Sequence, residues 1–249
     1  MNQDTDLAFL QYCENDDLRV LCDILTFDHD GKIRYSESLS DCDSYLTCYP
    51  DNMRGMWQEL ASELQKFGGN SILNYIRDGQ GPSYEKILRC VCKRMNVEDL
   101  DMNDTVEDIE QKLLITVSAK AIGQLGEEEI RSVMEECPIP VLEYSKQGLV
   151  AALMTLRVVN QRLFVMVIRT VMNVTVEALV GRGVASACMG IFSRGMSALC
   201  GPFGWLLLTG WTVWDLMGPA YRVTIPAVIQ VAYMRVKYLY MSDSKEIAA

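Results

Sequence analysis

Residues 26–37 have the residue types of a calcium-binding loop, although the pattern is incomplete. Such a loop needs oxygen ligands at positions one, three, five and twelve and a glycine at position six. Carboxylates and the glycine stand at all of these positions except the first, which is Thr26, and position nine is the cationic Arg34. The loss of one anionic ligand and the added positive charge would weaken a calcium site, so we expect an Asp-Gly turn here.

Other patterns that could support catalysis are equally incomplete. The single histidine, His29, lies in the same turn, and no serine or cysteine motif points to it, which argues against nucleophilic catalysis and a zinc site. Gly181-Arg182-Gly183 begins like a dinucleotide fingerprint, but the third glycine is replaced and no acid follows about 20 residues later. The sequence therefore favours a non-enzymatic protein that holds no cofactor or metal. An enzyme that uses acidic residues near 68–70 is a weaker hypothesis.

One isolated carboxylate stands out in the apolar tail. Asp215 lies among tryptophans and aliphatic residues, where a carboxylate must pair with a cation or take up a proton. Arg222 is its natural partner, and Arg194 and Arg169 are alternatives. We expect Arg162, Arg169, Asp215 and Arg222 to form an internal polar network. A structural ion pair is favoured at Asp215, and a proton-linked switch is the alternative.

Charge divides the chain into two regions. Residues 1–145 carry 29 acidic side chains against 13 basic ones, whereas residues 146–249 carry 4 against 10. An acidic region that prefers water is therefore followed by a basic, apolar one, and Pro138 and Pro140 mark the boundary. The basic residues are scattered among aliphatic ones, which is not the basic stripe that nucleic-acid binding needs. The nine cysteines include no CxxC motif, so we expect reduced thiols that serve as packing residues.

Apolar residues at helical spacing predict short helices throughout the acidic region. After a small N-terminal motif of about residues 1–37, we expect Gly68 and Gly69 to end one helix as a left-handed cap and Asp104 to cap another. The helices expected from this spacing cover residues 4–13, 53–67, 84–95, 104–121 and 127–137. Another is expected after residue 13, with Asp16 or Asp17 as its cap and Leu18, Leu21, Cys22 and Leu25 at helical spacing.

Beyond residue 145 the pattern is far more apolar. Residues 148–180 read as one long helix whose polar side chains form a single narrow stripe, and such a helix is buried in protein or in lipid. A core helix is favoured over a membrane-facing one. We expect Pro219 and Pro226 to break the chain before a last helix at 227–240, whose Arg235 and Lys237 mark its exit into water.

Residues 195–214 contain no charged side chain and have the length of a membrane span. Pro202 and several glycines interrupt this stretch, so a helical hairpin is as plausible as one span. Trp205, Trp211 and Trp214 are the expected contacts with a protein partner or a membrane surface, although they would also suit a core.

Six motifs spread along the chain carry a family resemblance: DLAFLQYC at 6–13, LTFDHDGKIR at 25–34, YPD at 49–51, ELQKFGGN at 63–70, SYEKIL at 83–88 and GPAYRVTIPAVIQVAYMR at 218–235. Together they resemble the YaaW-like family of uncharacterised bacterial proteins. The resemblance implies a helical protein on the cytoplasmic side of the membrane and supplies no catalytic residues. Some members have been likened to the helical ubiquinol–cytochrome c assembly chaperones, which adds a chaperone-like hypothesis.

These observations predict an all-α protein with an acidic helical region at 1–145 and an apolar, glycine-rich helical bundle or hairpin at 146–249. We expect a cytoplasmic interaction protein, either free or on the inner membrane, that docks on the membrane or on a membrane-protein client. The alternative is a soluble, chaperone-like assembly factor. The sequence indicates no nucleic-acid partner and leaves the oligomeric state open.

Overall fold

The computed structural model describes residues 4–28, 31–71, 81–139, 144–181 and 221–241, and this part of the chain is helical. Its only β-type pairing is an isolated bridge between Phe27 and Ile33, so the all-α prediction is confirmed. The elements are the 3-10 helices η1 (Thr5–Tyr12) and η2 (Met53–Met56) and the α-helices α1 (Asn15–Thr26), α2 (Asp43–Cys48), α3 (Trp57–Ser71), α4 (Tyr84–Met95), α5 (Val106–Gln124), α6 (Glu127–Glu136), α7 (Lys146–Val159), α8 (Gln161–Gly181) and α12 (Tyr221–Met241).

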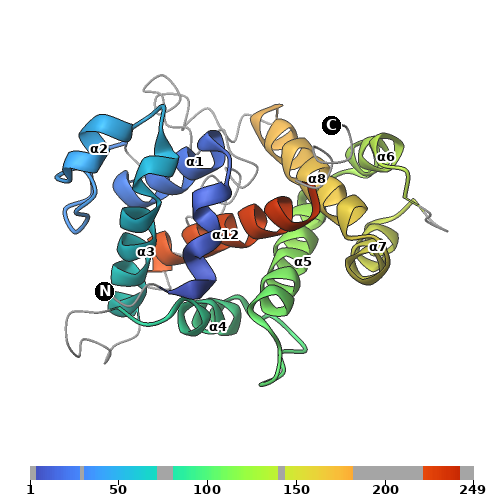
Figure 1. Cartoon of the computed structure of the whole chain (residues 1–249). Coiled ribbons are helices and arrows are strands. Elements are labelled where there is room, and N and C mark those ends of the chain that lie inside the picture. The colour runs from blue at the N-terminus through green and yellow to red at the C-terminus, as the bar shows by residue number, and fades with distance from the viewer. Residues whose placement is uncertain (1–3, 29–30, 72–80, 140–143, 182–220, 242–249) are drawn as a thin grey trace, which may run out of the picture.

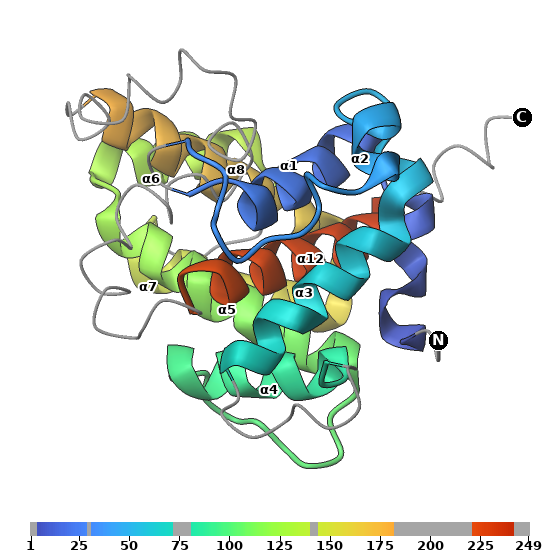
Figure 2. The same cartoon turned by 90° about the vertical axis from the view of Figure 1, so that its left-hand side faces the viewer.

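Helix α12 runs through the middle of the molecule (Figures 1 and 2). Every residue from 223 to 236 is buried, and the helix packs against η1, α1, α3, α4, α5 and α8. Buried apolar residues from both ends of the chain form one core cluster. Full burial of a large aliphatic side chain stabilises a fold by about 1.5–3 kcal/mol, so the buried aliphatic residues of α12 contribute substantially to its packing against these helices.

The predictions for the last helix were wrong at both ends. Pro226 lies inside α12, which begins five residues earlier at Tyr221, although a proline removes one helical hydrogen bond. Arg235 is buried, and Lys237 donates to Glu14 Oε2 at 2.6 Å and to Asp17 Oδ2 at 2.7 Å. These two cations do not mark an exit into water, because acidic residues of the N-terminal region bind them.

A buried polar network fixes α12 against three other elements. Arg235 Nε donates to Glu110 Oε2 of α5 at 2.6 Å, and the hydroxyl of Tyr84 on α4 donates to Glu110 Oε1 at 2.6 Å. The guanidinium also donates to the carbonyl of Asp6 and lies over the ring of Phe9 in η1, 4.2 Å from its centroid. Burial raises the pKa of Glu110 to about 7, although the nearby Arg235 opposes this shift. The network satisfies a buried carboxylate whose side chain is inaccessible to solvent.

Two other expectations fail because helix packing overrides local signals. Gly68 and Gly69 lie within α3 and do not end it, and a Cβ at Gly68 would lie 2.4 Å from Ile87 Cδ1 of α4. Glycine therefore allows α3 and α4 to approach closely. Thr105, and not Asp104, caps α5 through a capping box with Asp108.

The apolar stretch 148–180 forms two helices where one was predicted. The chain breaks at Asn160, whose side-chain Oδ1 accepts a hydrogen bond from the N–H of Leu163 in the first turn of α8. The narrow polar stripe on α8 is exposed, and the opposite side of the helix packs against α5, α6, α7 and α12. None of the helices in the described ranges combines the length and the apolar character that a membrane crossing needs.

Replacing Arg235 with methionine is expected to lower the free energy of unfolding by about 3–5 kcal/mol, because the buried Glu110 would have to hold its charge without a cation or take up a proton. Urea denaturation near pH 8 measures the loss. In the double variant Arg235→Met/Glu110→Gln the charge is gone and Tyr84 keeps an acceptor, so this variant should be the more stable of the two. A double variant that is no more stable than Arg235→Met would contradict the assigned role.

The raised pKa of Glu110 also predicts a pH dependence of stability. The carboxyl group has an ordinary pKa of 4.5 and a folded-state pKa of about 7, so the folded protein binds an extra proton between these values. Its contribution is complete below about pH 4.5 and declines as the pH rises to about 7. The stability of the wild type relative to Glu110→Gln should therefore fall over this range, by at most about 1.4 kcal/mol per pH unit. Urea titrations at several pH values test this, and a constant difference would refute it.

Candidate binding site

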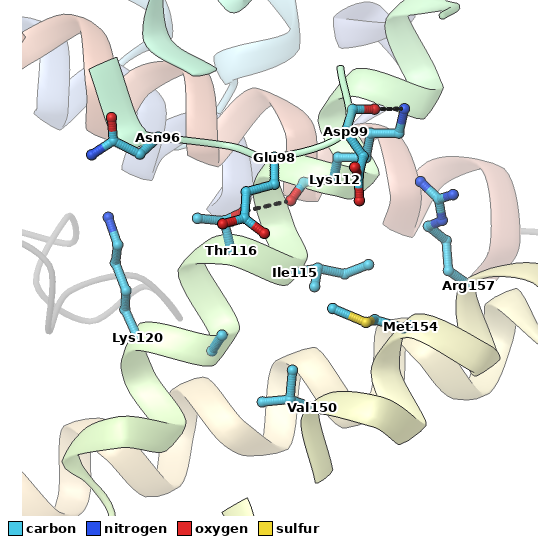
Figure 3. Close-up of a pocket in the computed structure, with 11 residues that line it drawn as sticks. Asn96, Glu98, Asp99, Lys112, Ile115, Thr116, Lys120, Val150, Met154 and Arg157 are labelled. Atoms are coloured by element: carbon cyan, nitrogen blue, oxygen red, sulfur yellow. Dashed lines mark hydrogen bonds between the residues drawn. The ribbon is translucent and has the colours of Figure 1, made fainter. Parts of the chain in front are cut away.

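A cavity of about 550 Å³ lies between α5, α7 and the connection that joins α4 to α5 (Figure 3). A second depression of about 400 Å³ continues it along the same two helices and shares Ala119, Val150 and Met154 with it. The cavity is lined by Asn96, Glu98, Asp99, Lys112, Ile115, Thr116, Ala119, Lys120, Val150, Met154 and Arg157. We refer to the two depressions together as the α5–α7 groove.

Backbone conformation and one lysine hold the wall formed by the α4–α5 connection. Asn96 ends α4 in the left-handed region, with φ 56°, and Asp99 has φ 57°. Lys112 Nζ donates to the carbonyl of Asp99 at 2.6 Å and to Asp104 Oδ2 at 2.5 Å. The hydrogen bond from Lys112 lowers the pKa of Asp104. Arg89 adds donors to three carbonyls of the same connection. The wall is thus tied to both helices that it joins.

Two cations in the groove form no ion pair with any described residue. Lys120 Nζ donates only to the carbonyl of Met95, at 3.3 Å, and partial burial lowers the pKa of its amine. Nη1 of Arg157 is buried and has no hydrogen-bond partner within the described ranges. The two cations lie at opposite ends of the cavity in Figure 3. A buried donor without a partner costs free energy that a ligand acceptor would recover.

The floor of the groove and its outer edge are apolar. Ile115, Val150 and Met154 lie between the two cations (Figure 3), and Met154 is 57% exposed. Val158 and Val159 follow on α7 with exposed fractions of 74% and 70%. The described part of α7 therefore presents apolar side chains to solvent beside a concave site.

The groups that line the cavity offer charge and apolar contact to a ligand. Among its described residues the only hydroxyl is that of Thr116, which donates to the carbonyl of Lys112. The seven described cysteines are free thiols, and none lines the groove. Burial raises the pKa of Cys13, Cys22 and Cys92 to about 12, which keeps these thiols protonated and unreactive.

The described residues on either side of positions 29–30 in the calcium-like segment lie close together. They pair through the Phe27–Ile33 bridge, and Gly31 has a φ of 72°. His29 and Asp30 lie outside the described residues. Over the described ranges no cluster of His, Cys, Asp and Glu side chains is arranged to hold a metal ion.

The residues predicted from sequence do not form this site. Trp205, Trp211, Trp214 and Asp215 lie outside the described residues, so their roles and the pairing of Asp215 stay predictions. Arg162 and Arg169 are exposed on α8, whereas Arg222 is half-buried in the first turn of α12. None of these three arginines lines the groove.

Sequence reasoning missed Lys120 and Arg157. A signal for both existed, because neither cation has an acidic residue three or four positions away along its helix. Arg157 is also the only charged residue between Lys146 and Arg162. Both cations are thus isolated from acidic residues along the sequence, as Asp215 is from basic ones.

Comparisons with known proteins place relatives along nearly the whole chain. A family model described as "Domain of unknown function (DUF3944)" matches residues 1–35. A UPF0174 protein of Helicobacter pylori strain J99 is 33% identical over 98% of this chain and 95% of its own length. The UPF0174 protein YaaW of Escherichia coli strain K12 is 32% identical over 93% of this chain and 94% of its own length. A further UPF0174 protein of H. pylori J99 is 30% identical over 72% and 88% of the two chains. No solved structure matches the chain.

The role of Lys112 can be tested by its replacement with methionine. The variant loses the bonds to Asp99 and Asp104, so we expect a loss of about 1 kcal/mol in the free energy of unfolding. We also expect faster proteolytic cleavage within residues 97–104. Lys93→Met, which alters an exposed lysine of α4, is the control. Equal cleavage rates in the two variants would show that Lys112 does not hold the wall.

Proposed function

The chain belongs to the UPF0174 family of YaaW-like proteins, and from its α5–α7 groove we propose that it is a non-enzymatic interaction protein that binds a client protein. The client is held at the groove and at the adjoining exposed face of α7. This role needs no cofactor or metal, and the groove's described lining residues fit it because they supply apolar contact and positive charge.

The observation that carries the proposal is the exposed apolar surface of α7. Met154, Val158 and Val159 are each more than half exposed on one short helix that borders a concave site. Single exposed apolar residues are common on monomers, but Met154 and Val158 stand one turn apart on one face of α7 beside the groove, which is typical of an interaction site. A client would remove this surface from water and gain about 25 cal/mol for each Å² of apolar area buried.

Two kinds of client fit this surface. A membrane protein would suit the predicted docking at the inner membrane, with Trp205, Trp211 and Trp214 as further contacts. A soluble subunit would suit the chaperone-like alternative. The groove is compatible with both, since each client would offer an apolar segment with acidic residues.

Photo-crosslinking from the exposed face of α7 beside the groove tests the proposal. A photoreactive amino acid at Val158 should give a discrete protein adduct in the cell of origin. The adduct should weaken at least about fivefold when Met154 is changed to aspartate, because a charge on the apolar face costs binding free energy. An adduct in the salt-washed membrane fraction identifies a membrane-protein client, and an adduct in the soluble fraction identifies a soluble one.

Leu46 provides a matched control, because it is also 74% exposed but lies on α2, away from α7 in both views (Figures 1 and 2). The same photoreactive group at Leu46 should give no discrete adduct, and Leu46→Asp should leave the Val158 adduct unchanged. Equal adducts from both positions, or only lipid adducts from Val158, would rule out client binding at this face.

A further inference from the structure

The groove has the dimensions of a short helix. On α5 its lining residues span Lys112 to Gly123, and on α7 they span Lys146 to Arg157. Each span covers eleven helical steps, or about 16 Å at 1.5 Å per residue. This length corresponds to about three turns of a third helix lying along α5 and α7.

The relative direction of α5 and α7 determines how far apart Lys120 and Arg157 lie along the groove. Lys146 Nζ at the start of α7 donates to the carbonyl of Gly123 near the end of α5, at 2.9 Å. The helices are therefore antiparallel, and at equal rise Arg157 lies level with Lys112. Lys120 lies eight residues from Lys112, so the two cations without ion pairs are separated by about 12 Å along the groove. Figure 3 shows them at its two ends, with Ile115 and Met154 between them.

We propose that the α5–α7 groove binds one amphipathic helix of a client protein, and that two carboxylates of this helix, seven or eight residues apart, pair with Lys120 and Arg157. This inference rests on the proposed function and specifies its partner. Carboxylates at that spacing lie about 10–12 Å apart along a helix, and about 20° (seven residues) or about 80° (eight residues) apart around its axis. Apolar residues between them, at the third and fourth positions, would pack on Ile115, Val150 and Met154.

The charge pattern favours such a helix over an anionic membrane surface. Glu98 and Asp99 form part of the cavity wall and are exposed. A uniformly anionic surface would bring negative charge against these two carboxylates as well as against the cations. A helix can place its carboxylates at two points and turn neutral or basic residues toward the wall. The concave shape of the site also fits a cylinder better than a plane.

Fluorescein-labelled helical peptides of about 15 residues test the inference by fluorescence anisotropy with the full chain. The first peptide carries leucines between two glutamates eight residues apart, and matched peptides carry glutamine or lysine at those two positions. We expect the glutamate peptide to bind about tenfold more tightly than the glutamine peptide, as two partly exposed ion pairs allow. A peptide with its glutamates only four residues apart should lose most of this advantage.

A charge exchange in the protein provides the second arm. In the variant Lys120→Glu/Arg157→Glu the order should invert, so that the lysine peptide binds most tightly. Lys120→Met/Arg157→Met should bind the glutamate and glutamine peptides equally and covers the case in which the reversed charges prevent folding. Leu46→Asp is the control and should behave as the wild type.

Several results would overturn the inference. The first is that the glutamate, glutamine and lysine peptides bind with equal affinity. The second is that the glutamate peptide does not bind at concentrations up to about 1 mM. The third is that the charge exchange leaves the order of the peptide affinities unchanged. Binding to phosphatidylglycerol vesicles that depends on the same two cations, without peptide binding, would assign the site to lipid. If the peptide preference fails while the Val158 adduct persists, client binding stands and only the proposed charge spacing is wrong.

Discussion

The ion pair between Glu110 and Arg235 is the interaction on which the arrangement of the helices depends. It joins α5 to α12 in the core, and the same two side chains also reach Tyr84 of α4 and the carbonyl of Asp6 in η1. Two buried charges are costly unless each is satisfied by the other and by further hydrogen bonds. Because hydrogen bonds need particular distances and angles, those of Glu110 and Arg235 restrict the position of α12 more than apolar packing alone would.

This core explains how the groove can be preformed. Helix α5 directs Glu110 toward α12, while Lys112, Ile115, Thr116, Ala119 and Lys120 line the groove on another side of the same helix. Helix α5 also packs against α4, α7 and α8, so these neighbouring helices hold its groove-lining residues in position. A groove held in this way needs little ordering when a ligand binds, which reduces the entropic cost of association.

The acidic and basic regions of the chain form ion pairs with each other in the folded protein. Arg235 pairs with Glu110, and Lys237 binds Glu14 and Asp17, so basic residues of the apolar region pair with acidic residues of the N-terminal region. The segment matched by the domain of unknown function, residues 1–35, contributes Glu14, Asp17 and the carbonyl of Asp6 to these contacts. Opposite charges in the two regions thus help to join the ends of the chain within one core.

Local pattern was sufficient for most helices before residue 140, because apolar spacing and turn residues act over one or two turns. The helix 84–95 and the burial of Leu18, Leu21 and Leu25 follow directly from such spacing. The helical class and the family resemblance also follow from the sequence alone.

Tertiary structure decided the remainder: that Pro226 lies within a helix, that Gly68 allows two helices to touch, and that Arg235 is buried. It also decided which cations lack an acidic partner among the described residues, since Lys120 and Arg157 are 37 residues apart in sequence and line one groove only because α5 packs against α7. Spacing along one helix determines which residues share a face, but the neighbour that covers that face is set by contacts distant in sequence.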